Sequence, residues 1–351
     1  MRVMKVAAIV AASTLVLAAC GGNNEDTGST SPSGTSTTAQ KSDVKVGLAY
    51  DIGGRGDKSF NDAAAAGLEK AKSEFGIEAK ELEAKPGETD AQKEERLRLL
   101  AQGGYNTVIA VGFAYATALK KVAGDFPDVH FAIVDDSSIQ APNVADLVFA
   151  ENEGSFLVGA AAALKTKSNH VGFVGGVNVP LIQKFQAGFD AGVKAVNKDI
   201  KIDNKYLTQP PDFSGFQDPA KGKVAGQGMY QGGADVVFAA AGSSGLGVFQ
   251  AAKDAGAMAI GVDSDQYNTV DAALKDVVMT SMIKKVDVAV YNFVKSVTED
   301  KPLTGTQTFD LKAGGVDFST SGGMVDDIKT KLDEFKQKII SGEIKVPDSV
   351  S

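Results

Sequence analysis

The sequence repeats one unit, a strand followed by a loop and a helix, in its two halves. The first copy opens with Val44-Lys45-Val46-Gly47-Leu48-Ala49-Tyr50-Asp51 and the second with His170-Val171-Gly172-Phe173-Val174-Gly175-Gly176. Three pairs of residues stand the same 125 positions apart: Gly47 and Gly172, Phe60 and Phe185, and Gly67 and Gly192. Equal offsets within units of the same type indicate an internal duplication. We therefore expect the chain to fold as two related halves.

Each half continues with short apolar strands that alternate with helices. These strands cover residues 106–112 and 129–135 in the first half, and 234–242 and 258–263 in the second. Continuous apolar strands that alternate with helices are typical of parallel sheets covered on both faces. The sequence therefore predicts an α/β fold of two doubly wound, Rossmann-like lobes with a central cleft.

Acidic residues and glycines stand where these strands end: Asp51, Gly112, Asp135, Gly242 and Asp263. In doubly wound sheets, ligands bind at the carboxyl ends of the strands. Clefts between domains are also favoured sites for small molecules. Two lobes with facing strand ends therefore predict a binding site for a small solute.

The first strand end leads into a glycine-rich loop, residues 51–61. This loop lacks the Gly-Lys-Ser/Thr of a Walker motif and the spacing of a dinucleotide-binding loop. The carboxylates of Asp51, Asp135 and Asp263 would repel a phosphate. They would instead accept strong hydrogen bonds from the hydroxyls of a sugar or ribose. The pattern favours a neutral, hydroxyl-rich ligand.

Phenylalanines near the predicted cleft could hold a flat ring. Phe60 opens a helix in the first half, and Phe213 and Phe216 lie in a loop of the second half, residues 210–219. Phenylalanines from opposite lobes could sandwich a nucleobase, because base–aromatic stacking contributes ~1–3 kcal/mol per base. Structural roles stay open: Phe60 could be a hydrophobic staple or a core residue, and the loop phenylalanines could cover the edge of a core.

The acidic residues have structural alternatives as well. Asp57 or Ser59 could cap the helix that begins near residue 59. Asp51 could organise the glycine-rich loop through backbone hydrogen bonds, and Asp263 could cap the turn that follows its strand. Sequence alone therefore leaves both structural and ligand-binding roles open for these residues.

The amino terminus has the pattern of an export signal. Arg2 and Lys5 precede an uncharged apolar run, residues 6–18, which is shorter than the ~20 residues of a membrane span. The run ends in Leu17-Ala18-Ala19-Cys20-Gly21, which resembles the lipobox of bacterial lipoproteins. We expect a signal peptide over residues 1–19, lipidation of Cys20 and a flexible polar tether over residues 20–43. The folded part would then stand on the extracytoplasmic face of the cell membrane.

Charge and composition argue against several classes of function. The net charge is −8 and no basic cluster follows the signal, so nucleic-acid binding has no electrostatic footprint. Cys20 is the only cysteine, and the two histidines, His130 and His170, stand at strand starts rather than strand ends. No nucleophile elbow and no His/Cys metal motif is present. We predict a protein that is not an enzyme and needs no cofactor or metal; a nucleoside hydrolase with paired carboxylates is the enzymatic alternative.

Five motifs follow one another along the chain: Gly56-Asp57-Lys58-Ser59-Phe60-Asn61, Ala150-Glu151-Asn152-Glu153-Gly154-Ser155-Phe156, Ala240-Ala241-Gly242, Gly261-Val262-Asp263-Ser264-Asp265 and Thr280-Ser281-Met282-Ile283-Lys284-Lys285-Val286-Asp287. Their order and spacing resemble the basic membrane protein family, the nucleoside-receptor branch of the substrate-binding lipoproteins of ABC transporters. The resemblance covers residues 44–346. It implies a type I periplasmic-binding-protein fold, a monomer, and partnership with ABC permease and ATPase subunits.

The resemblance also implies a purine nucleoside held between two phenylalanines. Phe60 matches the first, and Phe216 matches the second because Gly215-Phe216-Gln217-Asp218 resembles the family's Ser-Phe-x-Asp stretch; Phe213 is the alternative. The polar site residues match by position as follows: Asn61 and Asp135 at the base edge, Asp263 with its expected charge partner Lys284 at the ribose, and Asp51 and Gly242 at further contacts. Some relatives bind other solutes, so a sugar or riboflavin remains an alternative ligand.

The duplicated pattern also predicts where the chain passes between the lobes. We expect the first lobe to comprise residues 44–150 and 280–315, and the second residues 151–279 and 316–351. The crossings would fall near Ala150, Met279 and Gly315. A lipoprotein that only senses or adheres is an alternative from a different functional class.

Overall fold

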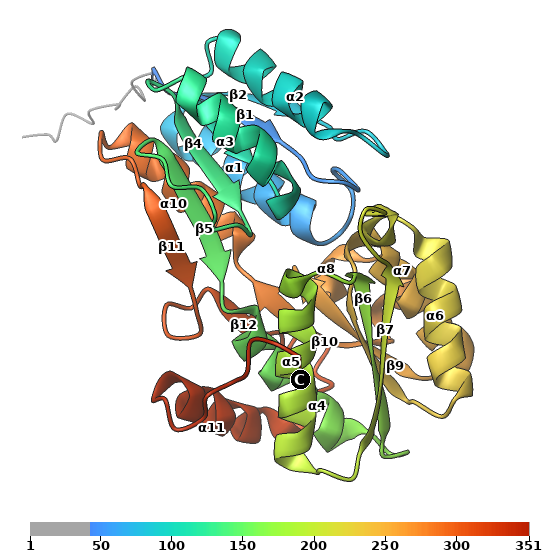
Figure 1. The fold of residues 1–351 in the computed structure, drawn as a ribbon. Coiled ribbons are helices and arrows are strands. Elements are labelled where there is room, and N and C mark those ends of the chain that lie inside the picture. The colour runs from blue at the N-terminus through green and yellow to red at the C-terminus, as the bar shows by residue number, and fades with distance from the viewer. Residues whose placement is uncertain (1–42, 351) are drawn as a thin grey trace, which may run out of the picture. The chain divides into compact units, whose positions relative to one another are not determined.

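The structure is a computed structural model that describes residues 43–350. The predicted signal peptide (1–19), the lipidation site Cys20 and the tether up to residue 42 lie outside the described residues. Residues 43–350 belong to one compact unit that contains two six-stranded sheets (Figure 1). Within this range no helix is both long enough and apolar enough to span a bilayer.

The first sheet has the strand order β11-β5-β4-β3-β1-β2, and its neighbouring strands are all parallel. Its strands are β1 (Lys45–Ala49), β2 (Glu78–Leu82), β3 (Thr107–Ala110), β4 (His130–Val134), β5 (Val144–Phe149) and β11 (Gly305–Phe309). The helices on one face are α1 (Phe60–Phe75) and α10 (Val286–Thr298). Those on the other face are α2 (Asp90–Gln102) and α3 (Ala116–Asp125), preceded by the 3-10 turn η1 (Phe113–Tyr115). Side chains alternate to match: Leu48 packs toward α1 and α10, and Ala49 toward α2 and α3.

The second sheet has the order β12-β10-β9-β8-β6-β7, in which only β12 runs antiparallel to its neighbour. Its strands are β6 (His170–Val177), β7 (Lys201–Thr208), β8 (Val236–Ala240), β9 (Met258–Asp263), β10 (Val278–Lys284) and β12 (Val316–Phe318). Helices α4 (Glu151–Lys165) and α5 (Pro180–Val196) cover one face, and α6 (Pro219–Gln231) and α7 (Gly245–Ala255) cover the other. The remaining elements are η2 (Ser214–Phe216), η3 (Gly242–Ser244), α8 (Gln266–Thr269), α9 (Ala272–Lys275), η4 (Asp326–Ile328) and α11 (Lys329–Ile340), which packs on α4.

The two sheets repeat one topology over five parallel strands and differ in the direction of the sixth, and the predicted fold class is confirmed. β1 lies between β2 and β3 just as β6 lies between β7 and β8, and Gly47 and Gly172 stand on these corresponding strands. Gly67 of α1 faces the backbone of α10, and Gly192 of α5 faces the backbone of α4. A Cβ at these glycines would lie 2.3 Å and 2.0 Å from a carbonyl oxygen of the facing helix. The equal offsets in the sequence therefore mark equivalent strands and equivalent close helix contacts.

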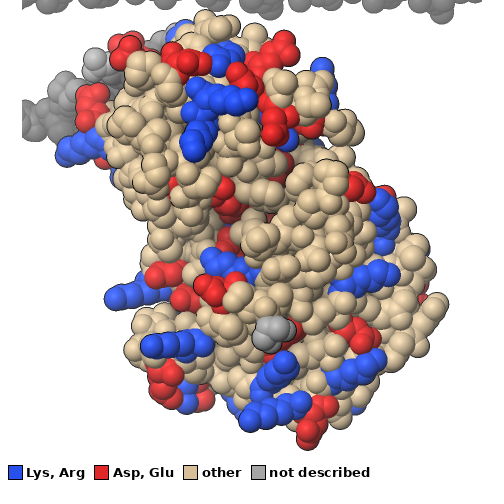
Figure 2. Space-filling view, in the orientation of Figure 1, with Lys and Arg blue, Asp and Glu red and all other residues tan. Residues whose placement is uncertain are grey.

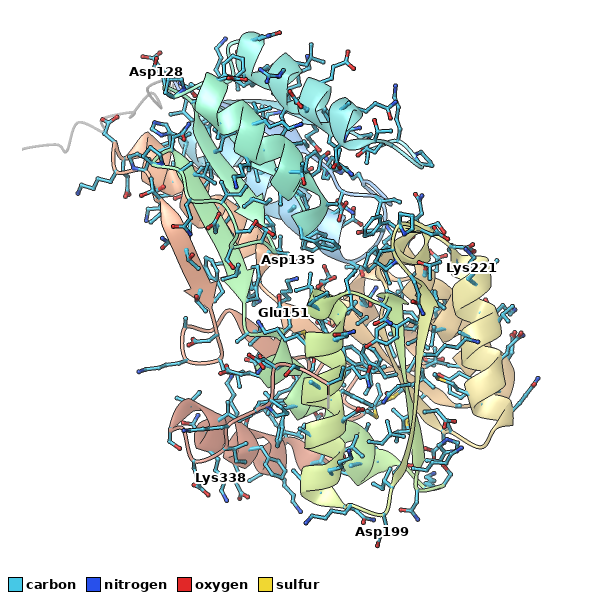
Figure 3. All side chains as sticks on the ribbon, viewed as in Figure 1. Asp128, Asp135, Glu151, Asp199, Lys221 and Lys338 are labelled. Carbon is cyan, nitrogen blue, oxygen red and sulfur yellow. The ribbon has the colours of Figure 1, made fainter. Side chains whose placement is uncertain are left out.

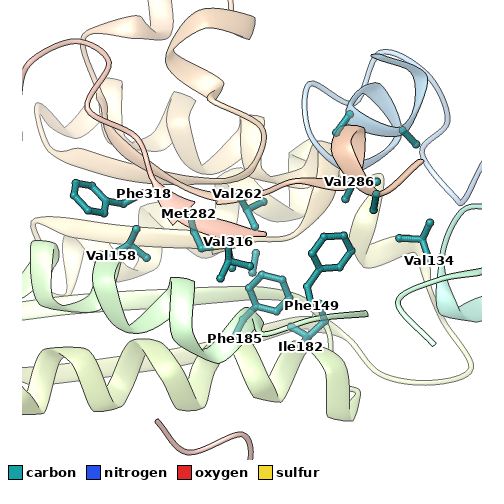
Figure 4. Packing of buried hydrophobic residues seen from close by; sticks show 14 of the residues in the cluster. Val134, Phe149, Val158, Ile182, Phe185, Val262, Met282, Val286, Val316 and Phe318 are labelled. Carbon is teal, nitrogen blue, oxygen red and sulfur yellow. The ribbon is translucent and has the colours of Figure 1, made fainter. Parts of the chain in front are cut away.

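One apolar cluster extends through both lobes. It runs from α1 and α10 across the crossing segments to α4 and α5. Figure 4 shows part of this cluster, including Phe149, Phe185, Val286 and Val316. Because this cluster is continuous, the lobes share buried surface in addition to the segments that connect them.

Three segments carry the chain between the sheets: β5 to α4, β10 to α10, and β11 to β12. Backbone hydrogen bonds tie these segments to one another. The Ala150 N–H donates to the Phe309 carbonyl at 3.0 Å, and the Lys285 N–H donates to the Gly315 carbonyl at 2.8 Å. The crossings therefore form one connected strip rather than three independent linkers.

The structure corrects one lobe boundary. Residues 280–284, which we expected in the first lobe, belong to β10 and pair with β9 and β12 of the second sheet. The second crossing therefore follows Lys284 instead of lying near Met279. The reason is that β10 continues as a buried strand up to Lys284, the first of two consecutive lysines. Its pairing with β12 extends to that residue.

The face of the molecule in Figure 2 carries acidic and basic side chains intermixed, without a large patch of one sign. This distribution agrees with a modest net charge of −8. Such a face offers no extended basic track of the kind that neutralises a nucleic-acid backbone.

Candidate ligand-binding site

A cavity with an empty volume of about 530 Å³ lies at the carboxyl ends of strands from both sheets. This space includes solvent at the open mouth of the cavity. All eight side chains and backbone positions proposed from the sequence as ligand contacts line it: Asp51, Phe60, Asn61, Asp135, Phe216, Gly242, Asp263 and Lys284. The fold thus brings together residues that lie up to 233 positions apart, from Asp51 to Lys284.

The loop after β1 is held in place by Asn61. Asn61 Oδ1 accepts a hydrogen bond from the Asp51 N–H at 3.0 Å, and its amide donates to Asp57 Oδ2 at 3.0 Å. The Asp57 carboxylate also accepts the backbone N–H groups of Ser59, Asn61 and Asp62 at 2.8–3.1 Å. Asp57, rather than Ser59, therefore provides the side-chain cap of α1. The Asn61 side chain lines the cavity, and both its amide oxygen and its amide nitrogen already bond within the loop, to Asp51 and Asp57.

Asp51 lies against Gly112, which follows β3. A Cβ at Gly112 would stand 2.3 Å from Asp51 Oδ2, and Gly112 has a φ of +100°. Glycine suits this position because it leaves room for the carboxylate and readily adopts a positive φ. Asp51 Oδ1 accepts the Ile52 N–H at 2.8 Å, which is the loop-organising role considered from the sequence. Burial raises the pKa of Asp51 to about 7. This carboxyl group therefore titrates near neutral pH.

A buried ion pair joins the two lobes beside the cavity. Lys284 Nζ lies 2.5 Å from Asp135 Oδ2 and 3.5 Å from Glu151 Oε1. Figure 3 shows Asp135 and Glu151 close together where the chain passes between the lobes. Glu151 Oε2 in turn lies 2.8 Å from Lys184 Nζ. The result is a chain of alternating charges from the end of β4 to α5.

This arrangement corrects the expected pairing of Lys284 with Asp263. Among the ion pairs of residues 43–350, those of Lys284 are with Asp135 and Glu151. Asp263 has a left-handed backbone, with φ of 64°, and its Oδ2 accepts the Ser59 hydroxyl at 2.6 Å. The expected pairing is wrong because Asp135 reaches Lys284 from the opposite lobe, whereas Asp263 is held by the loop before α1.

The electrostatics of the site combine one buried cation with several acids. Burial raises the pKa of Asp135 to about 7, although Lys284 opposes this shift. Burial likewise raises the pKa of Asp57 to about 6 and shifts the pKa of Asp263 upward. Burial alone would lower the pKa of Lys284, but the neighbouring carboxylates raise it above its ordinary value. The lysine therefore stays cationic, and hydrogen-bond donors on a ligand would stabilise the ionised carboxylates.

Three phenylalanine rings surround the Lys284 ammonium. Its Nζ lies 4.9 Å from the ring centroid of Phe60, 5.1 Å from that of Phe149 and 5.5 Å from that of Phe185. Such contacts between a cation and aromatic faces are attractive. Phe60 and Phe185 also line the cavity, so their rings serve both the buried cation and the ligand space.

The structure distinguishes Phe216 from Phe213. Phe216 lines the cavity, whereas Phe213 packs edge-on against Phe113 of the first lobe, with ring centroids 6.0 Å apart. Two glycines make room for Phe216. A Cβ at Gly176 would lie 2.4 Å from its Cδ1, and a Cβ at Gly242 would lie 2.7 Å from its carbonyl oxygen. Phe216, the first choice from the sequence, is thus the one that reaches the cavity.

Sequence reasoning missed several residues of this site. The cavity is also lined by Phe113, Leu181, Ile182 and Phe185, and Glu151 completes the ion chain. Two signals were available. Phe185 is the partner of Phe60 at the offset of 125 positions, and Phe113 directly follows the strand-end residue Gly112.

Comparison with known proteins agrees with this architecture. A family model described as "ABC transporter substrate-binding protein PnrA-like" matches residues 44–350. The chain belongs to this family. The match covers all of the strands and helices described above, so the two lobes and the cavity between them are those of a PnrA-like substrate-binding protein.

Individual relatives extend over almost the whole chain. The ABC transporter nucleoside-binding protein BmpA of Lactococcus lactis is 35% identical, covering 99% of this chain and 99% of that protein. An uncharacterized lipoprotein of Pyrococcus furiosus is 32% identical over 89% of this chain and 82% of its own length. The crystal structure of an ABC transporter solute-binding protein from Aeropyrum pernix aligns with a TM-score of 0.76 at 30% identity, covering 88% of this chain and 94% of that one.

Proposed function

We propose that this PnrA-like protein is the membrane-anchored, substrate-binding component of an ABC importer and that its ligand is a nucleoside, most favourably a purine nucleoside. One observation carries the proposal. Phe60 and Phe216 line a single cavity from opposite lobes, together with the carboxylates of Asp135 and Asp263. Aromatic faces suit a nucleobase, and carboxylates suit the hydroxyls of ribose. The printed name of the Lactococcus lactis relative supports the same ligand class.

Asp135 supplies the group that would bind the base edge. Its Oδ2 is engaged by Lys284, whereas its Oδ1 is buried and has no hydrogen-bond partner. A buried acceptor without a partner is costly, so a ligand N–H at this point would gain a strong hydrogen bond. Guanosine and inosine carry such an N–H on the six-membered ring of the base, which favours them as first ligands to test.

Asp263 is the residue we assign to the ribose. It stands at the end of β9, lines the cavity and is 7% exposed. Lys284 contributes by holding positive charge beside Asp135 and Glu151, which limits the repulsion among the acids. In this assignment the ribose hydroxyls donate to Asp263, and Lys284 acts at the junction of base and sugar.

Lipidation of Cys20 would place the receptor on the outer face of the cell membrane. The proposal rests on Leu17-Ala18-Ala19-Cys20, which precedes the described residues, and a relative is named as a lipoprotein. Cys20→Ala should abolish labelling by a fatty-acid analogue in growing cells. Equal labelling of variant and wild type would remove the anchor from the proposal.

The ligand itself is tested by binding and by product analysis. Mass spectrometry of small molecules that co-purify with the protein should detect a nucleoside, and calorimetry should show binding of guanosine or inosine. Prolonged incubation should release neither free base nor ribose. Detection of a sugar or of riboflavin instead would replace the ligand class, and base release that is lost in Asp263→Asn would make the protein a hydrolase.

The ribose assignment has its own comparison. Wild type should bind guanosine more tightly than 2′-deoxyguanosine, because a buried carboxylate loses a hydrogen bond when the hydroxyl is missing. Asp263→Ala should weaken guanosine binding and discriminate poorly between the two. If Asp263→Ala keeps the preference of wild type for the riboside, Asp263 is a structural residue only.

A further inference from the structure

The two residues before α1 make contacts that reach the other lobe. The Lys58 carbonyl accepts hydrogen bonds from Gln266 Nε2 at 3.0 Å and from Thr269 Oγ1 at 3.3 Å. The Ser59 carbonyl accepts the Ser264 hydroxyl at 3.0 Å. Lys58 and Ser59 belong to the first lobe, whereas these donors follow β9 in the second lobe.

The side chain of Ser59 reaches the same segment. Its buried hydroxyl lies 2.6 Å from Asp263 Oδ2 and 3.2 Å from the Val262 carbonyl. The hydroxyl has one proton, and the short bond to a carboxylate is the stronger of the two. Every partner of Lys58 and Ser59 in the second lobe therefore lies within residues 262–269.

The backbone of the loop is oriented for this contact. The N–H groups of Gly56 and Lys58 bond to the Asp62 carboxylate at 2.7 and 3.1 Å, within their own lobe. The Lys58 carbonyl accepts from Gln266 and Thr269 of the other lobe, whereas the Ser59 carbonyl accepts both the Ser264 hydroxyl of the other lobe and the Ala63 N–H of its own helix at 3.0 Å. Lys58 and Asp263, on the two sides of the contact, both have left-handed backbones with φ of 59° and 64°. Residues other than glycine keep such conformations where surrounding contacts enforce them.

Gln266, which donates to Lys58, is held in place by hydrogen bonds within the second lobe. Gln266 is fully buried, its Oε1 accepts the Val262 N–H at 2.9 Å, and its own N–H donates to Ser281 Oγ at 3.1 Å. Its amide nitrogen is therefore pointed at Lys58 by bonds within the second lobe. Little side-chain freedom remains to be lost when the lobes meet.

We propose that Lys58 and Ser59 form a latch with residues 262–269 that holds the two lobes together over the cavity and slows release of the ligand. The lobes cannot separate along this edge without breaking the hydrogen bonds of four side-chain donors: Ser59, Ser264, Gln266 and Thr269. These four residues do not line the cavity, so they act as positioning residues and not as ligand contacts. Ser59 stands between the cavity residues Phe60 and Asp263, which couples the latch to the site.

The latch is tested first without any ligand. Spin labels at Lys120→Cys in α3 and Lys253→Cys in α7, in a full-length chain with Cys20→Ala, report the distance between the lobes by electron-spin resonance. The double variant Ser59→Ala/Ser264→Ala should shift the distribution to longer distances, by about fivefold in the ratio of open to closed protein for each bond lost. Ser138→Ala is the matched control, because it removes a 2.6 Å serine–aspartate bond, to Asp136, within one lobe.

Two further variants keep this test decisive. Thr269→Val changes an exposed position and can replace the double variant if that variant does not fold. It should shift the distance distribution in the same direction by a smaller amount. Ser264→Thr retains the hydroxyl and should restore the distribution of wild type. Identical distributions for wild type and a folded double variant would overturn the latch.

A second measurement rests on the proposed nucleoside function. Stopped-flow dissociation of guanosine should be faster in Ser59→Ala/Ser264→Ala than in wild type, by about fivefold for each bond lost, with a smaller change in the association rate. If the double variant is more open by the distance measurement but releases guanosine no faster than wild type, the latch has no role in ligand release. If wild type binds no nucleoside, the proposed ligand fails, while the distance measurement still decides the latch.

Discussion

Lys284 Nζ and Asp135 Oδ2 lie 2.5 Å apart and belong to different sheets. Lys284 ends β10 of the second sheet, and Asp135 follows β4 of the first. Their side chains are 2% and 5% exposed, so each charge depends on the other for the solvation it has lost. Removing one partner of such a pair leaves an uncompensated buried charge. The ion pair is therefore both a link between the lobes and an interaction that favours the ionised form of Asp135 against the effect of burial.

Replacing the lysine tests this dependence. Lys284→Met should lower the free energy of unfolding by ~3–5 kcal/mol, because Asp135 and Glu151 lose their shared cation. Urea denaturation measures the change. Lys295→Met is the control: Lys295 is 45% exposed and pairs with Glu299 on the surface of α10, so its loss should cost less than ~1 kcal/mol. A cost for Lys284→Met as small as that of the control would show that the pair is dispensable.

The pH dependence of stability follows from Asp51. Its pKa is raised from 3.8 to about 7 by burial, so between these values the folded protein keeps a proton that the unfolded chain has released. The stability that this group contributes is full below about pH 4 and is lost as the pH rises through about 7. Asp51→Asn removes the titration, so its stability relative to wild type should increase between about pH 5 and about pH 8. Denaturation at both values measures it, and a constant difference would contradict burial of an ionisable Asp51.

The aromatic assignments predict a ranking of three variants. Phe60→Ala and Phe216→Ala should each weaken binding of guanosine, adenosine and inosine by ~1–3 kcal/mol, because every base has a π-face to stack. Phe213→Ala should have a smaller effect, since Phe213 packs on Phe113 and does not line the cavity. Calorimetric titration of the three variants supplies the comparison. A larger loss for Phe213→Ala than for Phe216→Ala would reverse the assignment of the second stacking residue.

The sequence predicted the strand-end residues well for a physical reason. Parallel strands in one sheet all end at the same edge, so Asp51, Asp135 and Asp263 could be placed near one another once their strands were recognised. The duplication extended this argument to the second lobe. It also related Phe185 to Phe60 by the offset of 125 positions, although Phe185 was not proposed from the sequence. Such inferences need only the strand pattern and the handedness of the fold.

The contacts between the lobes could not be predicted in the same way. Whether Lys284 meets Asp135 or Asp263 depends on how one lobe sits on the other, and no local periodicity encodes that. The same holds for Ser59, which a helix-start pattern marks as a cap but which donates to Asp263 of the other lobe. Strand end and helix start are local properties, whereas partners across the cleft are set by the packing of the whole molecule.

The ring of Phe216 occupies the space that a side chain at residue 176 would fill. Gly176 lies on β6, and a Cβ there would stand 2.4 Å from Cδ1 and 2.6 Å from Cε1 of Phe216. Gly176→Ala should therefore push the ring out of its place and weaken nucleoside binding, by up to the ~1–3 kcal/mol expected for loss of stacking. Gly228→Ala on α6 is the matched control: a Cβ there meets nothing within 4 Å, so helix propensity alone should stabilise the fold by ~0.5–1 kcal/mol and leave affinity unchanged. Calorimetry and thermal unfolding of both variants separate the two effects. If Gly176→Ala binds nucleosides as tightly as wild type, the seat of Phe216 against β6 has no part in binding, and the stacking assignment would have to rest on Phe60 alone.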